Sequence, residues 1–120
     1  MGTERTGSEL EERTIAFAIS TIEFVSLMSR GEAASVVGKQ LLRSATSIGA
    51  NYREANRAES KADFIHKTSL AQKEAAESDY WLQICLRAKL GQLGMANVLA
   101  TEAPELLAIL TTINRKAKGR

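Results

Sequence analysis

The sequence predicts an all-α fold, an antiparallel up-down-up-down four-helix bundle, on three observations. It is rich in Ala, Leu, Glu, Lys and Arg, and its 120 residues include one Pro and 5 % aromatics, which favours helices over sheets. Apolar residues recur at spacings of three and four in four long segments. The connections are short, so consecutive helices are expected to be antiparallel. We expect one domain over residues 1–120, with a flexible start at 1–7 and a basic tail at 115–120.

The first helix is expected at about residues 9–30. Ser8 and Glu11 have the spacing of a capping box, in which two side chains bond the backbone N–H groups exposed at a helix start. Gly31 can end this helix because glycine readily adopts the left-handed conformation. A second helix follows at about residues 36–57, with Ser35 as its N-cap. Its core positions are Val37, Leu41, Ile48 and Ala55.

The third helix is expected at about residues 61–90, with Ser60 as N-cap and Asp63 three residues on. Its core stripe is Phe64, Thr68, Ala71, Ala75, Ser78, Leu82 and Cys85. Gly91 and Gly94 bracket the next turn. The fourth helix fills about 95–117, and its core positions are Leu99, Leu106, Leu110 and Ile113. Pro104 lies inside it, and we expect a kink there or two short helices.

The first helix carries two apolar stripes. One consists of Ile15, Ala18, Ile19, Ile22 and Val25, and the other of Leu10, Phe17, Phe24 and Met28. Either both form one wide buried face, or one stripe packs inside and the other contacts a second subunit, since large exposed apolar patches mark interfaces. We assign the stripe of Leu10, Phe17, Phe24 and Met28 to an oligomer interface, with Trp81 from the third helix. Unlike patches on one domain predict a homo-oligomer, including a ring.

Polar residues lie at the edge of the core stripe on the second helix: Ser44, Ser47, Asn51 and Glu54. Buried polar groups need partners, and serine can bond back to a carbonyl one turn earlier. Two interpretations are open. The residues form a structural network that fixes helix register, with Arg43, Arg57 or Lys61 as counter-charges, or they line a ligand or catalytic pocket.

Basic residues gather on the outer side of the second helix and at the chain end. The net charge of +2 by itself predicts no nucleic-acid binding, but the segment 115–120, RKAKGR, has four basic residues and no acid. Lys39, Arg43, Arg53 and Arg57 fall within about 80° on the helical wheel. We assign these cations to nucleic-acid contact: Lys39, Arg43, Arg53, Arg57, Lys61, Arg115, Lys116 and Lys118. The alternative is an ordinary solvated face and end, and Arg43 also has the structural role above.

Several classes of function find no support in the sequence. It contains no Gly-rich phosphate loop, and we expect no catalytic residue, cofactor or metal. His66 follows Asp63 by three residues, which is one of the two acid-x-x-His motifs that a di-iron bundle requires. The lone Cys85 falls on the core stripe, so we expect a buried, unreactive thiol. The polar start is not a signal peptide and no stretch resembles a membrane span, which favours a cytoplasmic protein without membrane contact.

Residues 41–84, LLRSATSIGANYREANRAESKADFIHKTSLAQKEAAESDYWLQI, resemble a known family. These are the bacterial four-helix-bundle proteins encoded within intervening sequences of 23S ribosomal RNA genes. The motif is R-S-A-x-S-I-x-x-N-x-x-E, followed by a spaced Ser and an acidic-Phe pair. Here it consists of Arg43, Ser44, Ala45, Ser47, Ile48, Asn51, Glu54, Ser60, Asp63 and Phe64.

The resemblance implies small non-enzymatic bundles. Members also resemble the accessory variability protein of diversity-generating retroelements, a ring-shaped pentamer that contacts a reverse transcriptase and nucleic acid. By this resemblance the chain is expected to form a homopentamer, with RNA, DNA or a reverse transcriptase as candidate partners. It also favours a structural role for the polar edge, with Ser60 and Asp63 helping to tie the second helix to the third. On that interpretation the substitution Asn51→Ala lowers the free energy of unfolding by about 1–3 kcal/mol.

The sequence therefore predicts a non-enzymatic, homo-oligomeric bundle that binds nucleic acid or a nucleoprotein partner through a basic surface. The alternative is a purely protein-binding oligomeric scaffold without nucleic-acid contact. An enzyme would need a pocket converging on His66 or Glu54.

Overall fold

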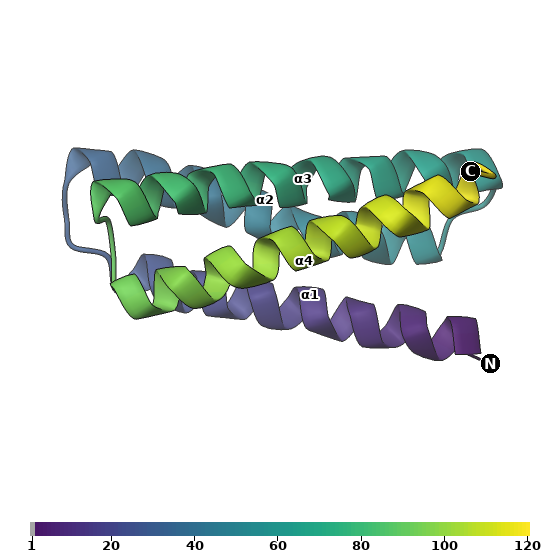
Figure 1. The fold of residues 1–120 in the computed structure, drawn as a ribbon, viewed down its shortest axis with the longest axis horizontal. Coiled ribbons are helices and arrows are strands. Elements are labelled where there is room, and N and C mark those ends of the chain that lie inside the picture. The colour runs from purple at the N-terminus through teal and green to yellow at the C-terminus, as the bar shows by residue number, and fades with distance from the viewer. Residues whose placement is uncertain (1) are drawn as a thin grey trace.

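Four helices account for most of the chain. The computed structural model describes the backbone of residues 2–120 and the side chains of residues 7–120. The helices are α1 (Gly2–Ser26), α2 (Glu32–Asn56), α3 (Lys61–Ala88) and α4 (Leu93–Ala117). They run in alternating directions, and both chain ends lie at the same end of the bundle (Figure 1). Each helix packs against the next, and α4 returns to α1, within an envelope of 44 × 22 × 21 Å. The predicted four-helix bundle is confirmed.

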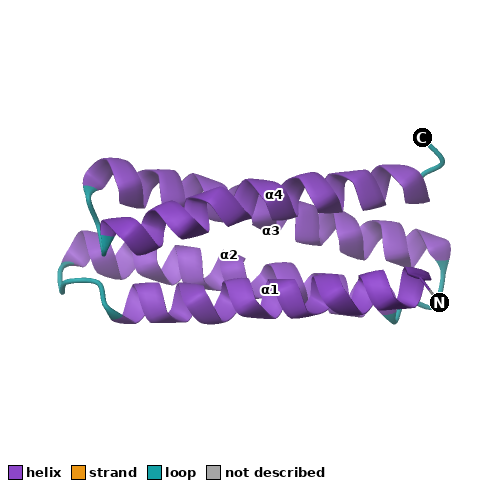
Figure 2. Cartoon of the chain, turned by 60° about the horizontal axis from the view of Figure 1, so that its bottom comes forward, coloured by secondary structure: helices purple, strands orange, loops and turns teal. Residues whose placement is uncertain are grey.

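The connections lie at opposite ends of the bundle. The turn between α2 and α3 is beside the two chain ends, and the α1–α2 and α3–α4 connections are at the far end (Figure 2). Ser60 caps α3 as predicted, because its side chain accepts a hydrogen bond from the backbone N–H of Asp63 at 3.0 Å. At the other end of α3 the residue after the helix, Lys89, adopts the left-handed conformation, with φ of 56°, although it is not a glycine. Gly91 follows with φ of 83°.

Other predicted helix ends are wrong. α1 begins at Gly2, so Ser8 and Glu11 lie inside the helix and form no capping box. α2 begins at Glu32, so the predicted cap Ser35 lies in its first turn. α4 begins earlier than expected, and Gln92 caps it by accepting a hydrogen bond from the Met95 N–H. These ends were misjudged because Ser and Gly also occur inside helices when packing compensates for their weak propensity.

Pro104 does not divide α4, which is one continuous helix from Leu93 to Ala117. The proline is exposed, so water can reach the carbonyl group that its ring leaves without a partner. α4 is also the one described helix that is long and apolar enough for a membrane span by length and composition, with a mean hydropathy of 1.3. Its buried residues contribute to the bundle core, which also produces such a composition.

The core corrects the assignment of the two stripes on α1. Leu10, Phe17 and Phe24 are buried in the subunit's own core, with Phe17 3 % and Phe24 0 % exposed, so they are not an interface. Met28 and Trp81 are half-buried and pack against the same core. The large aromatic side chains fill the space between the four helices, which the β-branched isoleucines cannot reach from the opposite side of α1.

The other stripe of α1 faces solvent. Ile15, Ile19 and Ile22 are 42 %, 51 % and 46 % exposed. We call these three residues the isoleucine face. Beneath it α1 and α2 approach closely, since a Cβ built on Gly49 would lie 2.5 Å from Thr14 Oγ1. Only glycine fits at that position of α2.

The seam between α1 and α4 is held by ions. Arg13 donates to both carboxylate oxygens of Glu102 at 2.6 and 2.7 Å, and to Glu105 at 2.8 Å. The Glu102 hydrogen bond, with that of Glu105, raises the pKa of Arg13. An apolar groove of about 450 Å³ lies on one side of Arg13, and another of about 500 Å³ lies on the other.

Candidate nucleic-acid interface

The basic residues on α2 do not form one continuous surface. Arg43 leans toward α3, where its guanidinium lies 3.3 Å from Glu74 Oε1 and pairs with Glu77. The hydrogen bond with Glu77 raises the pKa of Arg43. The Trp81 indole N–H donates to the same Glu77 carboxylate at 3.1 Å. Arg43 therefore has a structural role, but its partners are Glu74 and Glu77 of α3 rather than the polar residues of α2 that were predicted. These ion pairs tie α2 to α3.

Arg53 and Arg57 lean the other way, toward α1. Arg53 Nε is 3.8 Å and Arg57 Nη1 is 3.9 Å from the same oxygen of Glu11. The second carboxylate oxygen of Glu11 accepts a hydrogen bond from Asn56 Nδ2 at 2.8 Å. Glu11 and Asn56 were not predicted as neighbours of these arginines, because the spacing of Ser8 and Glu11 fits a helix cap. The i, i+3, i+4 spacing of residues 53, 56 and 57 was the available signal.

The remaining predicted cations are exposed, and none of them pairs with a carboxylate among the described side chains. Lys61 lies at the start of α3, and Arg115 and Lys116 lie in the last turn of α4, with Lys118 just beyond it. Among the side chains that the structure describes, none of these four is within 4.0 Å of a carboxylate. They share the end of the bundle where α2 meets α3 and α4 finishes (Figures 1 and 2). Lys39, also exposed, is alone toward the opposite end of α2.

The predicted polar network separates into local contacts. Ser78 on α3 donates to Ser44 on α2 at 2.9 Å in the buried core, and Ser44 donates back to the Leu41 carbonyl. Lys67 donates to Glu54 at 2.7 Å on the surface, and this bond raises the pKa of Lys67.

The remaining members of that network bond within one helix or its cap. Among the described residues, Asn51 Nδ2 donates to one group, the Ser47 carbonyl of its own helix, at 2.9 Å, so the predicted cost of a stranded buried partner does not apply. Ser47 bonds back to the Arg43 carbonyl, and Asp63 takes part through its backbone N–H at the Ser60 cap. Two of the six predicted residues, Ser44 and Glu54, thus connect α2 to α3 by their side chains.

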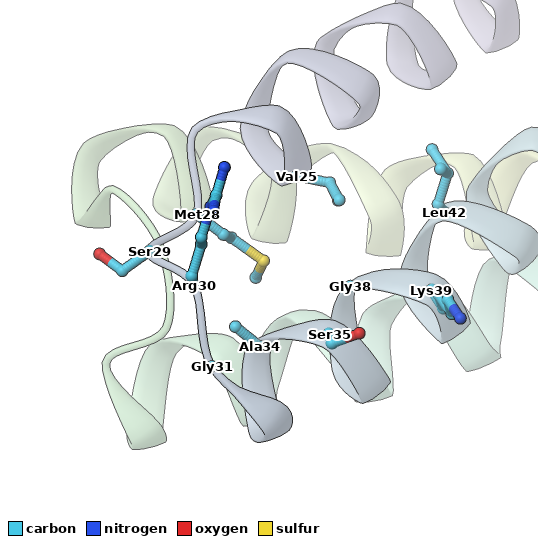
Figure 3. Close-up of a pocket in the computed structure, with 10 residues that line it drawn as sticks. All are labelled: Val25, Met28, Ser29, Arg30, Gly31, Ala34, Ser35, Gly38, Lys39 and Leu42. Carbon is cyan, nitrogen blue, oxygen red and sulfur yellow. The ribbon is translucent and has the colours of Figure 1, made fainter.

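Within the part of the chain that the structure describes, no group of three His, Cys, Asp or Glu residues can hold a metal ion. His66 is exposed, and burial raises the pKa of Cys85 to about 11. The hollow at the α1–α2 connection, of about 370 Å³, has a largely apolar floor of Val25, Met28 and Leu42 (Figure 3). Arg30 and Lys39 are the charged residues that line it.

Fold and surface together define a small α-helical bundle with a closed core, a basic end and an uncovered apolar face. Residues 8–112 match the family model of the 23S rRNA-intervening sequence proteins, and the chain belongs to that family. Four solved chains match it. One is described as a protein with unknown function from the S23 ribosomal protein family of Bacteroides thetaiotaomicron. It is 33 % identical, covers 91 % of this chain and 97 % of its own length, and has a TM-score of 0.82. A search of curated proteins finds no match.

Proposed function

We propose that this protein is a non-enzymatic module that assembles with copies of itself and binds nucleic acid, or a nucleoprotein partner, through its basic end. The observation that carries this proposal is the set of exposed cations at one end of the bundle, Lys61, Arg115, Lys116 and Lys118, without carboxylate partners among the described side chains. Unpaired cations that share a surface attract phosphates and release counterions on binding. Membership in a family named for ribosomal RNA intervening sequences makes RNA the first ligand to test.

Self-association is supported by the isoleucine face. Three exposed isoleucines on one helix form an apolar surface that a soluble protein normally covers. On α3 the side chain of Tyr80 is exposed and stacks edge-on against Trp81, with ring centroids 5.1 Å apart. These surfaces are unlike and lie on different helices, an arrangement that suits a head-to-tail ring. The resemblance to the pentameric accessory variability protein makes a pentamer the proposed assembly. The proposed location is the cytoplasm.

Binding is tested with a fluorescein-labelled single-stranded RNA and the matching DNA over a range of KCl concentrations. We expect affinity to fall steeply with salt. Lys116→Gln with Lys118→Gln should weaken binding and lower the slope of log K against log salt by about 0.7 per contact removed. Lys73→Gln with Arg87→Gln removes the same charge from α3 outside the basic end and is the matched control. An affinity that does not change with KCl concentration would contradict the proposal, and so would an equal loss of affinity in both double variants.

Assembly is tested by light scattering during size-exclusion chromatography. Five protomers of 13.0 kDa give a particle of about 65 kDa. Ile19→Lys should dissociate it without unfolding the subunit, because Ile19 is 51 % exposed. Val98→Lys, at an exposed apolar position on α4, is the control and should leave the assembly intact. A monomeric wild type at high concentration would refute self-association.

The second candidate function is a protein-binding scaffold whose contacts are apolar. The same isoleucine face favours it, because that face can receive a different protein, of which a reverse transcriptase is the candidate by resemblance. The two functions separate in the binding experiment. A protein-binding scaffold shows no salt-dependent affinity for RNA or DNA. Its binding to the protein partner is lost in the Ile19→Lys variant.

A further inference from the structure

The last turn of α2 holds three donors around one carboxylate. Arg53, Asn56 and Arg57 lie on one side of the helix, at the spacing that brings side chains together. Glu11 from α1 lies among them, hydrogen-bonded to Asn56 and near both guanidinium groups. Two positive charges therefore face one negative charge at this point.

This carboxylate is held loosely by the arginines. Their nitrogen atoms are 3.8 and 3.9 Å from Glu11 Oε1, beyond hydrogen-bond distance, whereas Arg13 contacts Glu102 at 2.6 Å. The Arg53 and Arg57 side chains are 62 % and 61 % exposed, and Glu11 beneath them is 21 % exposed. Ion pairs of this kind contribute little to stability, so the arginines remain available to another anion.

Most donors of the two guanidinium groups are unused. Each guanidinium has five N–H donors in a planar fork that suits the oxygens of a phosphate. Among the described residues, the one hydrogen bond that either group donates runs from Arg57 Nη1 to the Arg53 carbonyl, at 3.3 Å. A hollow of about 140 Å³ between α1 and α2 adjoins the cluster, and Glu11, Arg53 and Gly49 are among its lining residues.

We propose that Arg53, Asn56 and Arg57 form an anion cradle for a phosphate group of a nucleic-acid backbone, in which Glu11 is a resident carboxylate that the phosphate displaces. This inference rests on the proposed function and adds a site with a built-in competitor. The phosphate makes charge-assisted hydrogen bonds to two guanidiniums, where Glu11 makes none, and so it binds in preference to the carboxylate. Glu11 lowers the affinity of the cradle and excludes weaker anions.

The test is the change Glu11→Gln, measured with a fluorescein-labelled single-stranded RNA of about 20 nucleotides at low salt. Glutamine keeps an oxygen acceptor for Asn56 and removes the negative charge, so the fold should be retained. We expect the RNA to bind about threefold more tightly or better, because a like charge next to the phosphate is gone. Glu12→Gln is the matched control: Glu12 is exposed, has no partner among the described side chains, and should change affinity less than twofold.

A second variant tests the cradle from the other side. Arg57→Gln should weaken RNA binding and lower the salt slope by about 0.7, and the effect of Glu11→Gln should shrink in its presence. Thermal unfolding followed by circular dichroism checks that each variant is folded. If Glu11→Gln binds no more tightly than Glu12→Gln while the wild type shows salt-dependent binding, the cradle is refuted and the proposed function stands. If the wild type shows no salt-dependent binding, the proposed function fails and the cradle fails with it.

Discussion

Asn114 is the polar residue whose removal should most weaken the contact between α3 and α4. Its side chain is buried, and Nδ2 lies 3.0 Å from the Ile65 carbonyl, 2.9 Å from Thr68 Oγ1 and 2.9 Å from Ser69 Oγ. A carbonyl only accepts hydrogen bonds, so the amide nitrogen must face Ile65. Its two N–H groups are shared among the three oxygens.

The magnitude follows from this geometry. Asn114→Ala removes both N–H donors of a buried side chain, and with them the hydrogen bonds that join α4 to α3, which costs about 1–3 kcal/mol of stability. Asn51→Ala is the matched control, because the one hydrogen bond of the Asn51 side chain among the described residues is to the Ser47 carbonyl of its own helix. Both changes gain the same few tenths of a kcal/mol in helix propensity, which cancels in the comparison. We expect Asn114→Ala to be less stable than Asn51→Ala by about 1–2.5 kcal/mol.

Urea unfolding at neutral pH, followed by circular dichroism, gives both free energies of unfolding. Equal m-values in the two variants are required, because a change in m would mean that the unfolded states differ. A difference between the variants below about 0.5 kcal/mol would refute the reasoning, since it would show that the α3–α4 hydrogen bonds exchange for water at no cost.

Three further predictions follow from the packing and the charges. Gly49→Ala should destabilise the fold by about 1–3 kcal/mol in urea unfolding, in spite of its higher helix propensity, because the new Cβ would lie 2.9 Å from Thr14 Cβ; an unchanged midpoint would contradict this. Since burial raises the pKa of Cys85 from 9.0 to about 11, its thiolate fraction at pH 8 should fall about a hundredfold, and labelling by a disulfide reagent should be slow until urea is added. The Trp81 indole lowers the pKa of Glu77 below its ordinary 4.5, so Glu77 stabilises the fold above that value and loses this contribution as pH falls through its folded pKa. Glu77→Gln should therefore flatten the pH dependence of the free energy of unfolding as pH falls below about 4.5, and a pH profile parallel to that of the wild type would contradict this prediction.

Much of the fold could be predicted because its signals are local. Ser60 and Asp63 are three residues apart, and the cap they form needs nothing from elsewhere in the chain. The core stripe of α3 was also predicted correctly from Thr68 to Cys85, because these residues recur at helical spacings of three and four. α1 has two stripes, and periodicity alone does not say which of them faces inward. The stripe that contains Phe17 and Phe24 faces inward because these large side chains fill the space that the other three helices leave, and a local sequence pattern does not show that space.

The site was less predictable because its contacts join distant residues. Glu11 and Asn56 are 45 positions apart, and a sequence pattern within one turn assigned Glu11 to a cap instead. Arg13 and Glu102 are 89 apart, and no local pattern connects them. The exposed lysines and arginines at 115–118 needed no partner to be recognised, and they lie on the surface as the tail's composition indicated.

The single tryptophan gives this molecule an internal optical probe with a restricted view. Trp81 lies on α3, and its indole donates to Glu77, which pairs with Arg43 of α2. Its emission therefore reports whether α2 and α3 remain together. Fluorescence and helical ellipticity followed in the same titration would thus show whether α2 separates from α3 before the helices unfold or together with them.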